Sequence, residues 1–223
     1  MRNLLYLGAA LAAAAATPAF ATDADGRLQV KVLATAVLPD GTIKDVKTNL
    51  VGIPATSQTK ANDNVVPTVA IEYYATPDLS VETICCVTQH HVKGTGPIAG
   101  TDIVDHVLIL PATLTLKYHA RLGPVRPYVG IGPSLFLIFD EKPGATARAL
   151  GASRVKMSNE LGLALQAGVD IPVNDKGIGI SFDAKRYFMN TTATFYTAAG
   201  VEALKTKHAL DPWVLSSGVY FRF

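Results

Sequence analysis

The sequence has no apolar run long enough for a membrane-spanning helix once its first twenty-one residues are set aside. Such a helix needs about 20 consecutive apolar residues, so we expect no helical spans. Charge is also scarce: 17% of the 223 residues are charged, the formal net charge is +2, and there is no basic run. This balance gives no reason to expect nucleic acid as a partner. A chain with 49% hydrophobic residues and no helical span is either soluble or a β-barrel.

Cysteine is nearly absent, and the two cysteines, Cys85 and Cys86, are neighbours. A bond between them could not staple distant parts of a fold, and in a strand their side chains point to opposite faces. We interpret them as two small hydrophobic side chains. A redox or metal-binding role is the alternative, and nothing else in the sequence predicts a cofactor.

The N-terminus carries the pattern of a secretory signal. Arg2 precedes an apolar stretch from Leu4 to Ala16, and Ala19-Phe20-Ala21 matches a small-x-small cleavage site. The apolar stretch is too short for a helical anchor, which is the other interpretation. We therefore expect residues 1–21 to be a signal peptide and residues 22–223 to form the mature domain.

The last fourteen residues predict a transmembrane β-strand. Counting back from Phe223, the alternate residues Phe221, Val219, Ser217, Leu215 and Trp213 form a largely apolar face with aromatics near both ends. Barrel strands in the outer membrane alternate apolar and polar residues in this way, with aromatic girdles at both interfaces. We expect the terminal Phe223 to be a signal for the barrel-assembly machinery, and outer-membrane lipid to surround the domain.

The mature chain predicts an all-β fold, an eight-stranded antiparallel transmembrane β-barrel. Its connections are alternately long and short, as in outer-membrane barrels with long extracellular loops and short periplasmic turns. The long loops are expected at Asp40–Asn64, Lys93–Asp102, Asp140–Lys156, with a helical turn at Ala145–Leu150, and Asn190–Lys207. The eight strands are expected at Gly26–Pro39, Val65–Ala75, Leu79–His91, Asp105–His119, Arg126–Phe139, Met157–Ile171, Ile178–Met189 and residues 208–223.

Four prolines, Pro67, Pro111, Pro127 and Pro133, interrupt the runs of the predicted strands. Proline removes a donor from the strand ladder, so it marks a bulge or a local break in pairing. Two interpretations stay open here: an opening in the barrel wall, or a bulge without function.

Alternation also predicts which side chains face the lumen. A barrel of eight strands has an interior just wide enough for side chains to fill. Charged groups there should pair, because an isolated buried ion costs several kcal/mol or more. We therefore expect a narrow or plugged lower lumen holding a charge network of Lys31, Glu72, Glu82, Lys117, Glu160, Asp170, Asp183, Lys185 and Arg222.

Above this network, the same alternation turns apolar residues inward. They predict a hydrophobic pocket with a polar floor, open to small hydrophobic ligands from outside. Slippage of the alternation at bulges would instead turn these residues to lipid. The pocket residues are Ile84, Val107, Ile109, Pro111, Phe136 and Ile138, with Cys86 beside them.

Several stretches resemble the outer-membrane protein W (OmpW) family of eight-stranded barrels. They cover five of the eight strands in the right order and are Thr68–Tyr74, Leu79–Glu82, Leu110–Leu114, Arg126-Pro127-Tyr128-Val129-Gly130-Ile131-Gly132 and Leu210-Asp211-Pro212-Trp213-Val214. The resemblance implies an outer-membrane channel for passive uptake of small hydrophobic molecules, closed toward the periplasm and releasing cargo sideways through a proline-associated gap that would fit Pro111. It also implies phages or bacteriocins as partners.

A structural or adhesive barrel acting through its loops is the main alternative. An enzyme would need a nucleophile beside a base, but Ser134 and Ser158 have no such motif, and His90 and His106 should point to opposite faces. A metal site at His90, His91 and His106 lacks ligand spacing, so we expect exposed loop-end histidines. A soluble lipocalin-like barrel would bury its apolar face, against the charged interior predicted here.

Overall fold

A computed structural model describes residues 26–223 of the protein. The predicted signal peptide lies outside these described residues. The elements in chain order are β1 (Leu28–Leu38), β2 (Thr42–Asn49), β3 (Gln58–Ala61), β4 (Asn64–Tyr74), β5 (Leu79–Cys85), β6 (Thr88–Thr95), η1 (Gly96–Ile98), β7 (Asp102–His119), β8 (Arg126–Pro143), α2 (Ala145–Ala149), β9 (Ala152–Met157), β10 (Glu160–Pro172), β11 (Ile178–Phe188), β12 (Asn190–Thr197), β13 (Glu202–Ala209) and β14 (Trp213–Arg222). No helix among them is long and apolar enough to cross a membrane.

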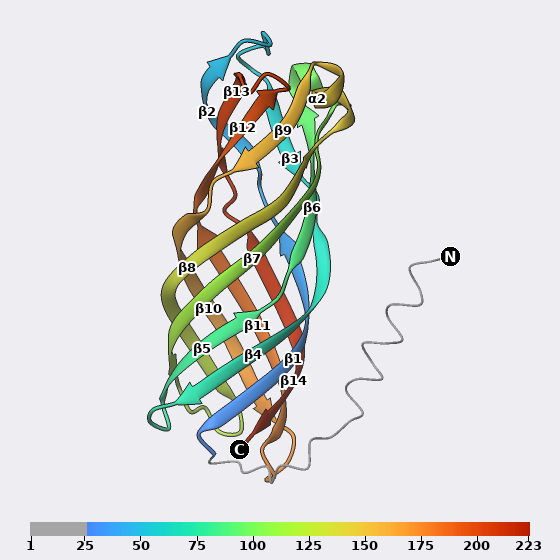
Figure 1. Ribbon diagram of the computed structural model, residues 1–223. Coiled ribbons are helices and arrows are strands. Elements are labelled where there is room, and N and C mark those ends of the chain that lie inside the picture. Colours follow the sequence, from blue (N-terminus) through green and yellow to red (C-terminus); the bar gives the residue numbers. More distant parts are fainter. Residues whose placement is uncertain (1–25) are drawn as a thin grey trace, which may run out of the picture.

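The long strands close into a barrel (Figure 1). The hydrogen-bonded order is β3-β6-β7-β5-β4-β1-β14-β11-β10-β8, and a further pairing of β7 with β8 completes the ring. Strands β5 and β6 are two halves of one wall strand, since both pair with β7. All pairings are antiparallel, so the predicted closed eight-stranded antiparallel barrel is confirmed.

A second sheet with the order β2-β13-β12-β9 stands above one end of the barrel (Figure 1). Its strands lie mainly in the segments Asp40–Asn64, Asp140–Lys156 and Asn190–Lys207, which the sequence predicted to be loops, so that prediction was wrong. Two of them, β9 and β13, run on to Met157 and Ala209. These strands lie beyond the barrel wall and are rich in Thr and Lys. Their buried apolar residues, such as Val155 and Phe195, are too few to give the alternating pattern of a wall strand. The helical turn predicted at Ala145–Leu150 is present as α2.

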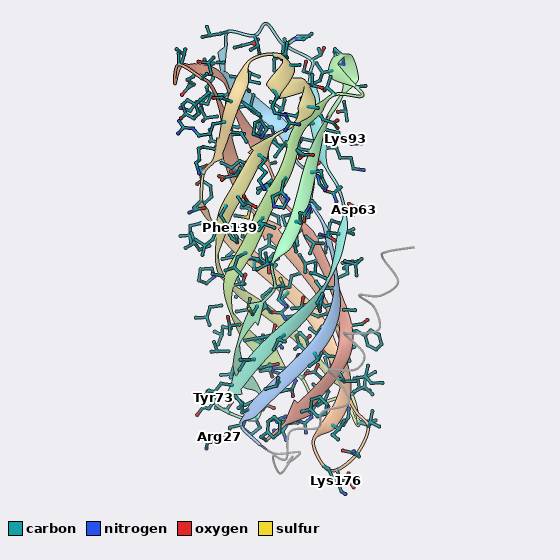
Figure 2. The ribbon with its side chains drawn as sticks, turned by 45° about the vertical axis from the view of Figure 1, so that its right-hand side comes forward. Arg27, Asp63, Tyr73, Lys93, Phe139 and Lys176 are labelled. Carbon is teal, nitrogen blue, oxygen red and sulfur yellow. The ribbon has the colours of Figure 1, made fainter. Side chains whose placement is uncertain are left out.

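The alternation of inward and outward side chains follows the prediction. The outward Leu161 is 72% exposed, whereas the inward Lys117 is fully buried. Figure 2 shows Tyr73 low on the outer wall and Phe139 higher up. Exposed aromatics at two levels of an apolar wall are typical of interfacial girdles in outer-membrane barrels. The end with short turns is therefore the periplasmic end, and the second sheet is extracellular.

The wall is interrupted between β5 and β6. The β4–β5 ladder ends at the pair Val69 and Cys85, and β6 pairs with β3 instead of β4. Residues 64–68 of β4 therefore pair with β1 on one side but have no ladder on the other within the described chain. We call this interruption, at Cys86 and Val87, the wall break. It divides the predicted third strand, Leu79–His91, into two.

Candidate transport pathway

The lower lumen is filled by a charge plug centred on Glu82. Its Oε2 lies 2.9 Å from Lys117 Nζ and 3.3 Å from Lys31 Nζ, while its Oε1 lies 3.0 Å from Lys185 Nζ. The amide of Gln166 also donates to Oε1 at 2.9 Å. These side chains come from five wall strands and are nearly or fully buried. Glu82 thus ties the strands together across the barrel axis.

Glu72 is the second hub of the plug. One of its oxygens lies 2.8 Å from Lys117 Nζ and the other 3.1 Å from Lys31 Nζ. Ser80 donates a hydrogen bond to it at 2.5 Å, and His119 Nε2 lies 2.9 Å away. Each carboxylate oxygen of Glu72 therefore has a charged or hydrogen-bonding partner, as buried charges require.

The two aspartates complete the plug. Asp170 pairs with Lys31 at 3.2 Å, and Asp183 pairs with Lys185 at 2.8 Å. Tyr128 donates to Asp183 at 2.7 Å and places its ring centroid 3.7 Å from Lys117 Nζ. A Cβ added at Gly168 would lie 2.4 Å from the Tyr128 hydroxyl, so glycine at this inward position leaves room for the ring. The lumen is blocked at this level.

Two residues predicted for the charge network lie outside it. Glu160 is half-buried at the upper end of β10 and accepts a hydrogen bond from Ser158 at 2.8 Å. Arg222 is buried at the opposite end, where its Nε donates to the carbonyl of Gly26 at 2.7 Å. Alternation assigns a side chain to the lumen but not to a height along it, which explains both errors. The other seven predicted members, Lys31, Glu72, Glu82, Lys117, Asp170, Asp183 and Lys185, are joined in the plug.

An apolar cavity, which we call the lower cavity, lies directly above the plug. Phe136 and Tyr187 meet edge to face at its base with ring centroids 5.2 Å apart, and the Tyr187 hydroxyl lies 3.3 Å from that of Thr113. The free volume is about 20 Å³, room for about one water molecule. The lining residues are Val37, Pro39, Ile84, Cys86, Thr88, His90, Ile109, Pro111, Phe136, Tyr187, Leu210, Pro212 and Val214.

The lower cavity brings together four of the six predicted pocket residues, Ile84, Ile109, Pro111 and Phe136. Val107 and Ile138 are buried in the surrounding apolar cluster but do not line the cavity. Tyr187 and Val214 were missed, although alternation from the inward Lys185 and Arg222 would have found them. Leu210 and Pro212 fall in the predicted strand 208–223, but in the structure they precede β14. The backbone turns at Asp211, so alternation is no guide to their direction.

A second apolar space, the upper cavity, lies among the extracellular strands. It has about 30 Å³ of free volume and is lined by Gly41, Ala61, Val92, Ile103, Val104, Met157, Ala193, Phe195, His208 and Leu210. Leu210 lines both cavities and therefore separates them. His208 is held by Thr59 at 3.2 Å and Thr206 at 2.7 Å, and burial lowers the pKa of its imidazole.

Leu210 is held in place by its neighbour Asp211. The Asp211 carboxylate accepts a hydrogen bond from the backbone N–H of Met189 at 2.7 Å, and its carbonyl accepts one from Arg186. Asp211 has φ of 28°, a value that non-glycine residues other than Asn and Asp rarely adopt. Arg186 also stacks over Trp213 with its guanidinium carbon 5.3 Å from the ring. The Leu-Asp-Pro-Trp stretch therefore fixes the partition between the cavities.

The wall break lies beside the lower cavity. Cys86 is buried and lines the cavity, whereas Cys85 is exposed on the outer face, as alternation predicted. Cys86 packs with Leu33, Ala70 and Ile84, and Thr68 of β4 lies next to it. Only side chains close the wall at this point.

Ser80, His119 and Glu72 contact one another in the plug, but not in the geometry of a nucleophilic triad. His90 is buried in the cavity lining and bonded to Thr88 at 3.0 Å, so the prediction that it is an exposed loop-end residue was wrong. Ser80 and Glu72 both contact His119 through Nε2, whereas a nucleophilic triad uses both ring nitrogens. Within residues 26–223, no three His, Cys, Asp or Glu side chains are placed to hold a metal ion.

The fold and the comparisons with known proteins indicate the same class of protein. A closed eight-stranded barrel with an apolar outer wall, aromatic girdles and a charged interior defines an outer-membrane barrel protein. The model of the OmpW family matches residues 24–223, and the chain belongs to that family. It is a protein of the bacterial outer membrane.

Three similar proteins illustrate the match. Outer membrane protein W of Vibrio cholerae is 26% identical over 219 residues, covering 96% of each chain. Dibenzothiophene metabolism operon protein PahQ of Pseudomonas aeruginosa is 29% identical over 165 residues, covering 73% of this chain and 74% of the relative. The crystal structure of outer membrane protein OprG from Pseudomonas aeruginosa superposes with a TM-score of 0.80 at 23% identity, covering 92% of this chain and 99% of that one.

Proposed function

We propose that the barrel is a channel for passive uptake of small hydrophobic molecules, which leave sideways into the bilayer through the wall break. The observation that carries the proposal is the position of the lower cavity between the charge plug and the break. An apolar molecule in this cavity has buried ion pairs below it and a wall without a ladder beside it.

The plug favours a sideways route over a straight one. A downward path would separate Glu82 from three lysines, and breaking a buried ion pair costs about 3–5 kcal/mol. A sideways path displaces apolar contacts of Cys86 with Leu33 and Ala70 and its contact with Thr68, but separates no ion pair of the plug. The name of the relative PahQ, which refers to dibenzothiophene metabolism, fits an apolar cargo.

Entry from outside would pass through the upper cavity. Both cavities are lined mainly by apolar side chains, and Leu210 stands between them. Their small free volumes mean that side chains must turn to admit a ligand, so the channel works by displacement of Leu210 rather than through an open pore.

Uptake of an apolar fluorescent tracer by cells with and without the barrel tests the proposal. Phe136→Asp places a charge in the lower cavity, where an unpaired carboxylate is strongly disfavoured, and should reduce uptake to the level of cells without the barrel. Phe139→Asp is the matched control, because Phe139 lies on the outer wall (Figure 2). Equal uptake in all strains, with folded barrel present, would favour the structural or adhesive function.

A reversible clamp tests the sideways step. In a Cys85→Ser background, Thr68→Cys would place a thiol beside Cys86 across the break. Oxidation should then stop uptake, and reduction should restore it. If uptake falls in Phe136→Asp but is the same with the clamp oxidised and reduced, the barrel is a channel but its cargo does not leave through the wall break.

A further inference from the structure

A third cavity lies at the periplasmic end, on the other side of the charge plug. Its volume is about 410 Å³, within the range of small-ligand sites. Arg27 and Lys176 mark this end in Figure 2. We call the cavity the arginine cup; its lining residues are Gly26, Arg27, Tyr74, Ala75, Thr76, Pro77, Arg121, Arg126 and Arg222.

The arginines reach the cup from separate parts of the wall. Arg27 precedes β1, Arg121 lies in the turn between β7 and β8, Arg126 begins β8, and Arg222 ends β14. They are far apart in the sequence, so no basic run indicates them. The closure of the barrel brings them to one mouth.

Arg222 is the fixed member of the cup. It is 5% exposed, its Nε donates to the carbonyl of Gly26 at 2.7 Å, and its guanidinium carbon lies 3.8 Å from the ring centroid of Tyr74. Arg222 thus stacks on a ring and makes one hydrogen bond to the backbone. Its terminal N–H groups form no ion pair with a carboxylate of residues 26–223. A guanidinium carries five donors, so this side chain is positioned to donate into the cup.

Positive charge in the cup exceeds negative charge in the described chain. Arg121 pairs with Asp78 at 2.8 Å. The terminal carboxyl group of Phe223 lies beside Gly26 at the rim. Asp170 is the register partner of Arg126 across β10 and β8, but its carboxylate is paired with Lys31 of the charge plug at 3.2 Å. Four guanidinium groups thus lie near three carboxylates, and neither Arg27 nor Arg126 has an ion pair with another residue of the described range.

Such a cluster is stabilised by an anion. Like charges that converge on one cavity repel each other, and the repulsion is weakly screened where the groups are partly buried. Guanidinium groups bind phosphate through paired, charge-assisted hydrogen bonds. Phosphate suits several guanidiniums better than a carboxylate does, because it carries more charge and more acceptor oxygens.

We propose that the arginine cup binds the phosphoryl group of a phosphate ester at the periplasmic mouth of the barrel. The group has two possible sources, a phospholipid headgroup of the inner leaflet or a water-soluble periplasmic phosphate ester. The site is separate from the transport pathway, since the plug lies between them.

Calorimetric titration of the full barrel in maltoside micelles, which contain no phosphate, tests this proposal. The probes are inorganic phosphate, sn-glycerol 3-phosphate, and phosphatidylglycerol added to the micelles. The wild type should bind at least one probe saturably. Arg27→Gln/Arg126→Gln should weaken that binding about tenfold or more, whereas Lys176→Gln, a cation on a nearby turn outside the cup, should not.

The choice of probe distinguishes the two sources of the phosphoryl group and shows which results would overturn the proposal. Saturable binding of glycerol 3-phosphate identifies a soluble ester, and binding of phosphatidylglycerol alone identifies a lipid headgroup. If no probe binds, or if acetate binds as tightly as phosphate, the proposal is overturned. Arg121→Gln provides a second variant, because Arg121 is 61% exposed and its loss should leave the fold intact while weakening binding. The variants of the cup should not change tracer uptake, so this test is independent of the test of the proposed function.

Discussion

Pro67 of β4 and Pro111 of β7 lie opposite the same two-residue break in the wall strand between them. Continuing the register beyond Val69 and Cys85 places Pro67 opposite Val87. Continuing it beyond Ile84 and Thr113 places Pro111 opposite Cys86. Proline has no N–H to offer a ladder, so each neighbour of the break lacks a donor at the point where pairing stops.

Restoring these donors should close the wall. Pro67→Val with Pro111→Val allows the ladders to extend through Cys86 and Val87, and we expect slower tracer uptake and greater protection of β4 amides from hydrogen exchange. Pro127→Val with Pro133→Val is the control, because those prolines lie in β8, opposite the continuous strand β10. Unchanged uptake in the first variant would show that the break does not limit transport.

The charge plug should depend strongly on Glu82. Glu82→Gln leaves Lys31, Lys117 and Lys185 without their shared carboxylate, and we expect a loss of about 3–5 kcal/mol in the free energy of unfolding. Urea unfolding in lipid vesicles measures it. Glu202→Gln removes a partly exposed partner of Lys205 and should change little; equal effects of the two substitutions would mean that the plug contributes no special stability.

Leu210 should control access to the lower cavity. Leu210→Ala joins the two cavities and should speed tracer uptake, whereas Leu210→Phe should slow it, because the larger ring fills the shared space. Both substitutions keep the side chain apolar. Rates that do not follow side-chain size, measured at equal amounts of folded protein, would contradict the role of Leu210 as a partition.

Acid should loosen the extracellular sheet around His208. Burial lowers the pKa of His208 in the folded protein, so its contribution to stability is fully present above the unfolded value of about 6.5. It is lost as the pH falls from there through the folded pKa. The protection factors of β13 and β2 amides against hydrogen exchange, which correct for the intrinsic effect of pH on exchange, should be lower at pH 5 than at pH 7. His208→Gln should remove this difference in protection.

The barrel could be predicted because the bilayer imposes a strict rule on each wall strand. Residues such as Lys117 and Leu161 show their direction by alternation alone, and seven members of the plug follow from it. Height along the lumen is not encoded in alternation, so Glu160 and Arg222 were misplaced. The extracellular strands were not predicted because their few buried apolar residues, such as Val155 and Phe195, stand among Thr and Lys and form no long alternating pattern. Leu210 was not predicted to line the pocket, because its position depends on the backbone turn at Asp211.

The pairing of β1 with β14, from Gln29 with Arg222 to Leu38 with Trp213, has a consequence for how the molecule forms. It joins the first strand of the described residues to the last, across a long separation in the sequence. Contacts of this kind slow folding because a long loop must close before they form. Lys31 of β1 meets Asp170 of β10 only when β1 and β14 close the ring, so ring closure and completion of the charge plug should occur as one late, cooperative event.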